Sequence, residues 1–185
     1  MKILHSLYCL IDVIPEFPYF LMALFFVFGE DISRARHVLA VLFIYVFLGI
    51  LSGMLVKYLT KSERPKQHYK ISIISYDVPS LHTLISVGLV SFTYFIDPKY
   101  AVALVPVGII YMQSRVSLGY HTRKAVLVGA AMGAAVGCMT GYMLWKINLP
   151  EPVEVLFVVL VLSTPLFATY LRVVNYRRFK ACRSK

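Results

Sequence analysis

The sequence predicts an all-α bundle of about six transmembrane helices. Hydrophobic residues make up 59% of the 185-residue chain, and the mean hydropathy is +0.73. Soluble domains contain roughly 45–50% apolar residues, so lipid is the expected solvent. Because a helix crosses a bilayer with about 20 apolar residues, little of the chain is left for a separate soluble domain. We therefore expect residues 1–185 to form a single multi-pass, integral-membrane domain.

Apolar runs place the expected helices along the chain. They cover residues 8–28, 38–59, 80–96, 99–116, 124–146 and 152–174. The first run contains Asp12 and Glu16, which are costly in the hydrocarbon core, so its complete span is left open. In the fifth run a glycine recurs at every fourth position from Gly129 to Gly141. Such a stripe of small residues predicts close packing against a neighbouring helix.

The formal net charge of +10 indicates anionic partners. Lys and Arg lie in short loops and in the basic tail 172–185 instead of on a soluble face, which excludes a nucleic-acid-binding domain. The tail is expected to anchor at anionic lipid head groups. Cys9, Cys138 and Cys182 are far apart and lack the spacing of a zinc site.

Two clusters of polar residues flank the loop between the second and third apolar runs. Lys57 lies near the end of the second run and Arg64 follows in the loop, so a turn would bring two cations to one anion. The third run begins at the segment P-S-L-H-T, residues 79–83. Proline and serine favour a helix start there, and the N–H groups of a helix N-terminus bind phosphate. Ser80 and His82 would lie at this N-terminus.

A third cluster closes the fourth run. Ser114 and Arg115 end that run, and His121 lies in the short turn before the fifth. Two spans separate His82 from His121, and an even number of crossings returns the chain to the same membrane face. All three clusters are therefore expected to meet. Their residue types suit a tetrahedral phosphoryl group that is held by cations while one imidazole attacks it and another protonates the leaving oxygen.

The patterns K-x6-R-P, P-S-x-H and S-R-x5-H resemble, in order and internal spacing, the three signature motifs of the type 2 phosphatidic acid phosphatase superfamily. The resemblance spans about residues 57–125. It implies that His121 is the nucleophile, which forms a phosphohistidine, and that His82 is the general acid. It also implies a metal-independent reaction without a cofactor. The residues that it assigns to the substrate phosphate are Lys57, Arg64, Ser80 and Arg115.

The chain departs from the family pattern at two positions. Leu81 stands where the second motif usually has glycine, and Ala125 stands where the third motif usually has an aspartate, four residues after the nucleophile. That aspartate orients the imidazole and stabilises its charge. Asp77 or Glu63 is a candidate substitute carboxylate. The candidate supporting residues of the site are Leu81, Ser114 and Asp77.

Within the superfamily, residues 76–82 and the Tyr120-His121-Thr122 segment look most like the dolichyl diphosphatase branch. We therefore expect hydrolysis of a lipid phosphate or diphosphate, with polyisoprenyl diphosphate favoured. The alternative is a catalytically weak or silent homologue that acts as a lipid-binding membrane protein. The sequence predicts neither the oligomeric state nor which membrane holds the chain.

The membrane face that carries the site is left open. If all six runs span, both termini lie on the face of the site. The basic tail then places that face in the cytoplasm by the positive-inside rule, whereas members of the family commonly face outward or into a lumen.

Overall fold

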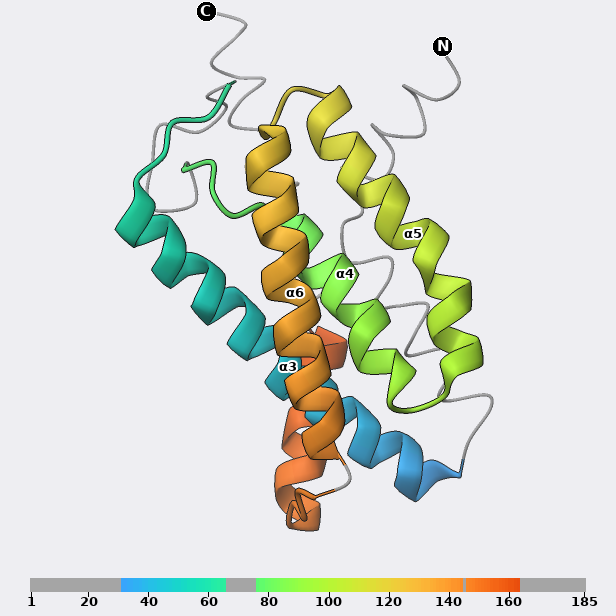
Figure 1. Ribbon diagram of the computed structural model, residues 1–185. Coiled ribbons are helices and arrows are strands. Elements are labelled where there is room, and N and C mark those ends of the chain that lie inside the picture. Colours follow the sequence, from blue (N-terminus) through green and yellow to red (C-terminus); the bar gives the residue numbers. More distant parts are fainter. Residues whose placement is uncertain (1–30, 66–75, 145, 164–185) are drawn as a thin grey trace, which may run out of the picture. The chain divides into compact units, whose positions relative to one another are not determined.

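The computed structural model describes residues 31–65, 76–144 and 146–163. Every regular element in these ranges is a helix, so the predicted all-α class is confirmed (Figure 1). The elements are α3 (Ile32–Thr60), α4 (Leu81–Tyr94), α5 (Pro98–Ser117), α6 (Arg123–Leu144) and a helical stretch that begins at residue 151 and is described to 163. The predicted helix 8–28 and the basic tail lie outside the described residues. The number of six helices therefore stays a prediction.

Four of the predicted runs coincide with α3 to α6 to within a few residues. The largest difference is at α3, which begins at Ile32 instead of residue 38. Its first turns contain Arg34 and Arg36, which are exposed and half-buried respectively. Apolar runs mark only the part of a helix that avoids water, so a polar first turn is missed.

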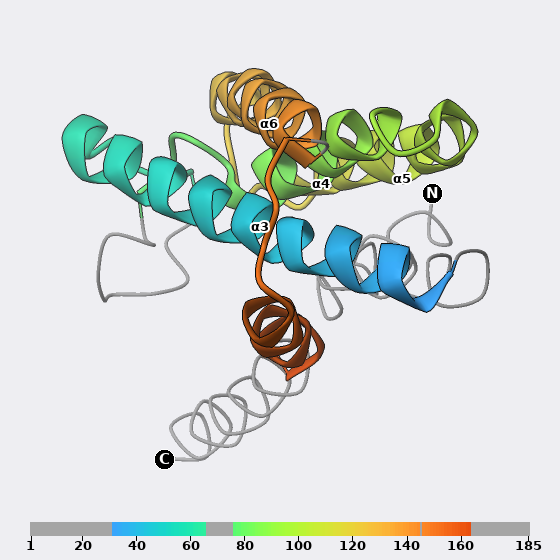
Figure 2. The same ribbon diagram turned by 90° about the horizontal axis from the view of Figure 1, so that it is seen from below.

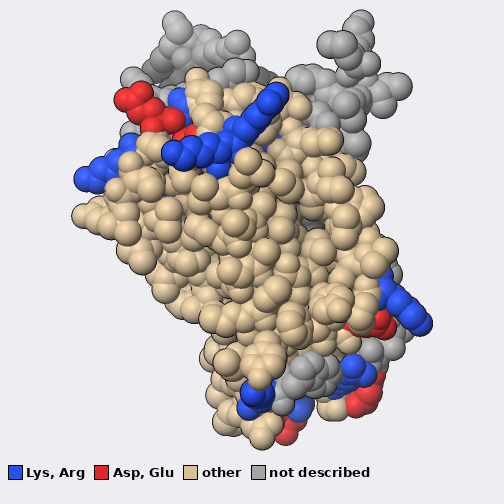
Figure 3. All heavy atoms as spheres, viewed as in Figure 1, with Lys and Arg blue, Asp and Glu red and all other residues tan. Residues whose placement is uncertain are grey.

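Length and composition allow α3 and α6 to cross a membrane. Helix α4 has 14 residues, which corresponds to about 21 Å against about 30 Å of hydrocarbon. Charged residues are confined to helix ends, since none lies between Lys99 and Arg115 or between Lys124 and Lys146. On the face shown in Figure 3, the surface over the middle of α6 carries no charged side chain. The multi-pass arrangement itself stays a prediction.

The described residues group into two compact units. The second unit contains residues 31–43 and 149–163. Within it, the Arg36 guanidinium donates to Glu154 Oε2 at 2.8 Å, and His37 Nδ1 lies 2.6 Å from Glu154 Oε1. These contacts pair the start of α3 with the helical stretch after residue 150. The first unit contains residues 44–65, 76–144 and 146–148, and it holds all the motifs described above.

Backbone contact between α4 and α6 organises the first unit (Figures 1 and 2). A Cβ atom added at Gly133 would lie 2.1 Å from Leu84 O, and one added at Gly137 would lie 2.1 Å from Gly88 O. Only glycine permits carbonyl groups to approach a helix axis so closely. The predicted close packing of the glycine stripe is thus confirmed, with α4 as the neighbour.

The later part of α3 covers α4 from another side. Tyr45 is buried, its hydroxyl donates to Ile85 O at 2.6 Å, and its ring stacks on Phe92 with centroids 5.7 Å apart. Two turns before the end of α3, a Cβ atom at Gly53 would lie 2.3 Å from Leu81 Cδ2. Gly53 therefore makes room for the Leu81 side chain.

The glycine stripe generates a stability prediction. Gly133→Ala should lower the free energy of unfolding by about 1–3 kcal/mol or more, because its methyl group would overlap a backbone carbonyl. Gly108→Ala on α5 is the matched control, since its Cβ would meet the nearest atom at 3.6 Å. The control should be neutral or stabilise by about 0.5–1 kcal/mol. Thermal unfolding in detergent measures both, and equal midpoints for the two variants would contradict the packing.

Candidate active site

The segment from Tyr76 to Ser80 leads into α4 and is fixed against the chain that follows α3. Asp77 N donates to Ser62 O at 2.8 Å, and Val78 N donates to Ser62 Oγ at 2.9 Å. The Thr60 hydroxyl donates to Val78 O at 3.1 Å. These bonds satisfy buried main-chain groups and hold the start of the second motif beside the end of the first.

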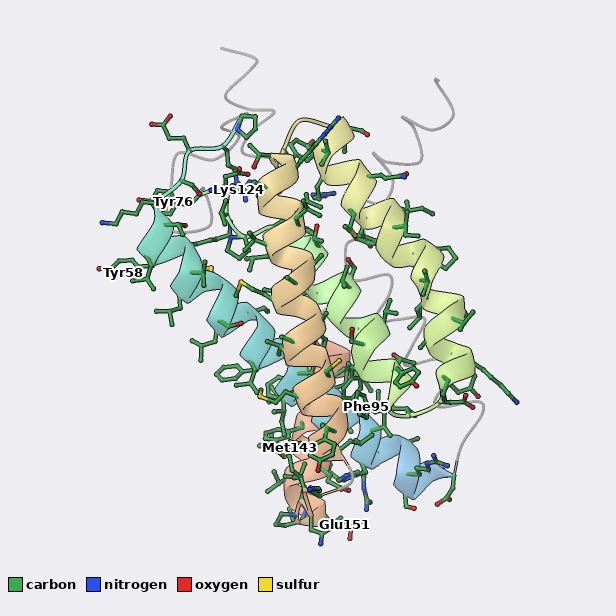
Figure 4. The ribbon with its side chains drawn as sticks, in the orientation of Figure 1. Tyr58, Tyr76, Phe95, Lys124, Met143 and Glu151 are labelled. Carbon is green, nitrogen blue, oxygen red and sulfur yellow. The ribbon has the colours of Figure 1, made fainter. Side chains whose placement is uncertain are left out.

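The two cations of the first motif meet at one carbonyl group. Lys57 Nζ donates to Tyr76 O and, at 3.3 Å, to Asp77 O. Arg64 Nε also donates to Tyr76 O, at 3.1 Å. Lys57 is completely buried and Arg64 is half-buried. In Figure 4, Tyr76 lies near the end of α3 and Lys124 near the start of α6, at the same end of this unit.

Helix α5 ends in a Schellman turn, and His121 directly follows this turn. Gly119 has φ 71°, a left-handed conformation that glycine adopts without steric cost. Gly119 N donates to Val116 O at 3.0 Å, and Tyr120 N donates to Arg115 O at 3.1 Å. His121 N bonds to the same Arg115 carbonyl at 3.1 Å. The backbone at the nucleophile position is thus anchored to the last turn of α5.

The imidazole of His121 contacts a carboxylate that lies just before the second motif. Its Nδ1 lies 2.8 Å from Asp77 Oδ1, and both side chains are buried. The Thr122 hydroxyl donates to Asp77 Oδ2 at 2.6 Å, and Thr122 N lies 3.3 Å from Asp77 Oδ1. Asp77 therefore bonds to His121, the last residue of the third motif, and to Thr122, which follows it.

The start of α6 joins this network to Ser80. Thr122 acts as the N-cap, because its hydroxyl accepts from Ala125 N at 3.1 Å. The Ala125 carbonyl accepts from Ser80 N at 3.0 Å. A Cβ atom at Gly129 would lie 2.6 Å from Ser80 O. The close α4–α6 contact thus reaches the site, and the segments of all three motifs lie at one end of the unit.

Ser80 and His82 lie at the N-terminus of α4. Leu84 N makes the first intrahelical bond, to Ser80 O at 2.9 Å, so the amides of residues 81–83 belong to the open end of the helix. The Ser80 hydroxyl accepts from Thr83 Oγ1 at 3.1 Å and makes no capping bond. His82 is half-buried on the first turn.

Arg115 and Ser114 lie on the last turn of α5. Arg115 is buried, and its guanidinium carbon lies 5.4 Å from the centroid of the Tyr120 ring, a favourable cation–π distance. Ser114 Oγ donates to Tyr111 O at 2.8 Å and lies 3.4 Å from Arg115 Nε. Ser114 thereby supports the cation that the sequence assigns to phosphate binding.

Burial controls the ionisation of His121. Burial, followed by the positive charge of Arg64, lowers the pKa of His121 to about 4. At pH 7 the ring is therefore neutral, and Asp77 accepts the proton of Nδ1, which leaves the lone pair on Nε2. A neutral imidazole with a free ring nitrogen beside Lys57 and Arg64 is a suitable nucleophile for a phosphate.

No group of three His, Cys, Asp or Glu side chains forms a metal-binding cluster within the part of the chain that the structure describes.

Comparison with known proteins places this arrangement in a family. The model of the PAP2 superfamily matches residues 37–149, which is more than half of the chain and includes all three motifs. The chain belongs to the PAP2 superfamily. Neither the curated proteins nor the solved structures contain a significant match. Members of the PAP2 superfamily are phosphatases and are typically membrane proteins, which supports a phosphoric-ester hydrolase in general. The dolichyl diphosphatase branch stays a prediction.

The structure shows the surroundings of both positions that depart from the PAP2 pattern. Leu81 directs its side chain to the space left by Gly53 on α3. Ala125 is completely buried and contributes its N–H and C=O to Thr122 and Ser80. Of the two candidate substitute carboxylates, Asp77 contacts His121, whereas Glu63 is exposed.

The sequence did not predict the structural roles of two residues of the site. Thr122 directly precedes α6, which is a typical signal of an N-cap, but its second bond to Asp77 depends on a residue 45 positions away. Ser62 holds the segment after Tyr76 through both its carbonyl and its hydroxyl. Nothing in the sequence signals that role.

The low pKa of His121 generates a prediction about pH. An unfolded His protonates near pH 6.5, but the folded ring stays neutral to about pH 4. Between these values the unfolded state binds more protons, so the free energy of unfolding should fall as the pH is lowered through this window. Denaturation in detergent at several pH values measures the slope. His121→Gln should flatten it, and an unchanged slope would contradict the buried neutral imidazole.

Proposed function

We propose that this PAP2 protein is a multi-pass membrane enzyme that hydrolyses a lipid phosphate or diphosphate without a metal ion, through a phosphohistidine at His121. The observation that supports this most is the contact of His121 Nδ1 with Asp77 Oδ1 at 2.8 Å, at a site where the positive charges of Arg64 and Lys57 act on the same imidazole. Phosphate binding falls to Lys57, Arg64 and Arg115, assisted by Ser80 and the amides at the start of α4.

The reaction has two halves. In the first, His121 Nε2 attacks the terminal phosphorus and the bond to the leaving oxygen breaks, while His82 as the general acid gives a proton to that oxygen. The leaving oxygen is the ester oxygen of a monophosphate or the bridging oxygen of a diphosphate. In the second, water attacks the phosphohistidine and gives a proton to His82. Inorganic phosphate leaves and both histidines return to their starting states.

Polyisoprenyl diphosphate is the favoured substrate, and phosphatidate-like or sphingoid phosphates come next. The similarity of the Tyr120-His121-Thr122 segment to the dolichyl diphosphatase branch supports this order. The excess of buried or half-buried cations over carboxylates supports it as well, since a diphosphate brings more negative charge than a monophosphate. Hydrolysis of a diphosphate would release the lipid monophosphate as the leaving group.

A phosphate-release assay tests the activity. Purified wild-type protein with a chelator should release phosphate from a panel of lipid phosphates, and His121→Ala should lower kcat by about 10³-fold or more. Acid-labile, base-stable labelling of the protein during turnover should also disappear in this variant. Lipid binding without turnover by the wild type would instead support a catalytically silent homologue.

Opposite ends of α5 provide a matched pair of variants for phosphate binding. Arg115→Gln should lower kcat/KM by roughly 10- to 100-fold, because a charge-assisted bond to phosphate contributes about 1.5–3 kcal/mol. Lys99→Gln removes the same charge from an exposed position at the other end of the helix and should change kcat/KM by less than about twofold. Equal losses in the two variants, measured as initial rates against lipid concentration, would show that only the overall charge matters.

A further inference from the structure

The buried side chain of Asp77 makes hydrogen bonds of its own, in addition to those of the Asp77 main chain. The Asp77 side chain is 3% exposed, and burying a charge is costly unless hydrogen bonds compensate. Oδ1 bonds to His121 Nδ1 at 2.8 Å, and Oδ2 accepts from the Thr122 hydroxyl at 2.6 Å. Thr122 N lies 3.3 Å from Oδ1 and 3.4 Å from Oδ2, so both oxygens are engaged and the plane of the carboxylate is fixed.

We propose that Asp77, held by Thr122, is the positioning carboxylate of His121 and takes the role of the aspartate that is replaced by Ala125. This inference rests on the proposed function, in which His121 is the nucleophile. The carboxylate reaches the imidazole from the segment before α4, whereas position 125 would supply it from α6.

The hydrogen bonds determine which nitrogen attacks. A carboxylate acts only as an acceptor, so the proton of the neutral ring resides on Nδ1 and Nε2 keeps its lone pair. When Nε2 bonds to phosphorus, the ring becomes positively charged, and Asp77 stabilises that charge. Asp77 thus favours both the reactive tautomer and the phosphorylated state.

Thr122 connects this carboxylate to α6. Its hydroxyl donates to Asp77 and accepts from Ala125 N. The same hydroxyl therefore caps α6 and holds the carboxylate. On the other side, the Asp77 carbonyl accepts from Lys57. Asp77 therefore couples the position of the phosphate-binding cation to that of the nucleophile.

Ala125 supplies no carboxylate to His121. Its side chain is completely buried, and its main-chain groups are engaged by Thr122 and Ser80. Ala125→Asp is therefore expected to leave kcat unchanged or to lower it, because Asp77 already occupies His121 Nδ1. A gain in kcat of more than about threefold would show that a carboxylate was missing, and would overturn the inference.

The decisive experiment measures the tautomer of His121 and the kinetics in the same variants. Long-range ¹⁵N NMR of histidine-labelled protein in detergent reports the tautomer, and the His121→Gln spectrum identifies the resonance. Wild type should show the Nδ1–H form at pH 7. Asp77→Asn should shift His121 towards Nε2–H and lower kcat by roughly 10²- to 10⁴-fold with KM within about threefold. Asp97→Asn, at the N-cap of α5, is the matched control and should change neither.

A second pair of variants keeps the test valid if Asp77→Asn fails to fold. Thr122→Val removes the hydroxyl, and it should lower kcat about tenfold and broaden or shift the His121 signals. Thr122→Ser keeps the hydroxyl and should retain kcat within about twofold.

The outcomes separate the two proposals. If wild type and Asp77→Asn share the same His121 tautomer and the same kcat, Asp77 does not position the imidazole, even though a phosphohistidine forms. If wild type shows the Nδ1–H tautomer, Asp77→Asn loses it, and no lipid phosphate is turned over, the positioning contact is real and the proposed hydrolysis is wrong. A wild-type Nε2–H tautomer would overturn the positioning role directly.

Discussion

The hydrogen bond from Ser80 N to Ala125 O is the contact on which the site depends. It is 3.0 Å long and lies at the N-terminal end of the glycine stripe, which packs α6 against α4. A side chain at Gly129 would collide with Ser80 O and separate the second motif from the third. The packing of α4 against α6 thus sets the distance between the polar groups at the start of these two helices.

The polar residues of the site are buried, and this burial needs compensation. Lys57, Arg115, Asp77 and His121 are each at most 3% exposed. Main-chain carbonyls from Tyr76 and Asp77 receive the Lys57 ammonium, and the Asp77 carboxylate balances part of the positive charge. The remaining excess of positive charge suits an anionic ligand. The same burial lowers the pKa of His121 to about 4 and keeps its ring neutral at pH 7, as the proposed nucleophilic role requires.

The two departures from the family pattern have contrasting consequences. Leu81 is accommodated by packing, because α3 carries glycine at the position that faces it. Ala125 occurs together with a carboxylate from the segment before α4, since Asp77 contacts His121 and accepts a hydrogen bond from the Thr122 hydroxyl. Both depend on residues far apart in the chain, since Gly53 lies on α3 and Asp77 lies 44 positions before His121.

The sequence alone determined the helical class, the limits of α4 to α6, the packing role of the glycine stripe and the three motifs. These features depend on composition and on short spacings, since apolar runs and motif residues are local. Only the tertiary structure decided that α4 is the partner of the stripe and that Asp77, not Glu63, reaches His121. Both depend on contacts between residues far apart in the chain, where the direction of a side chain follows from helix packing and hydrogen bonding.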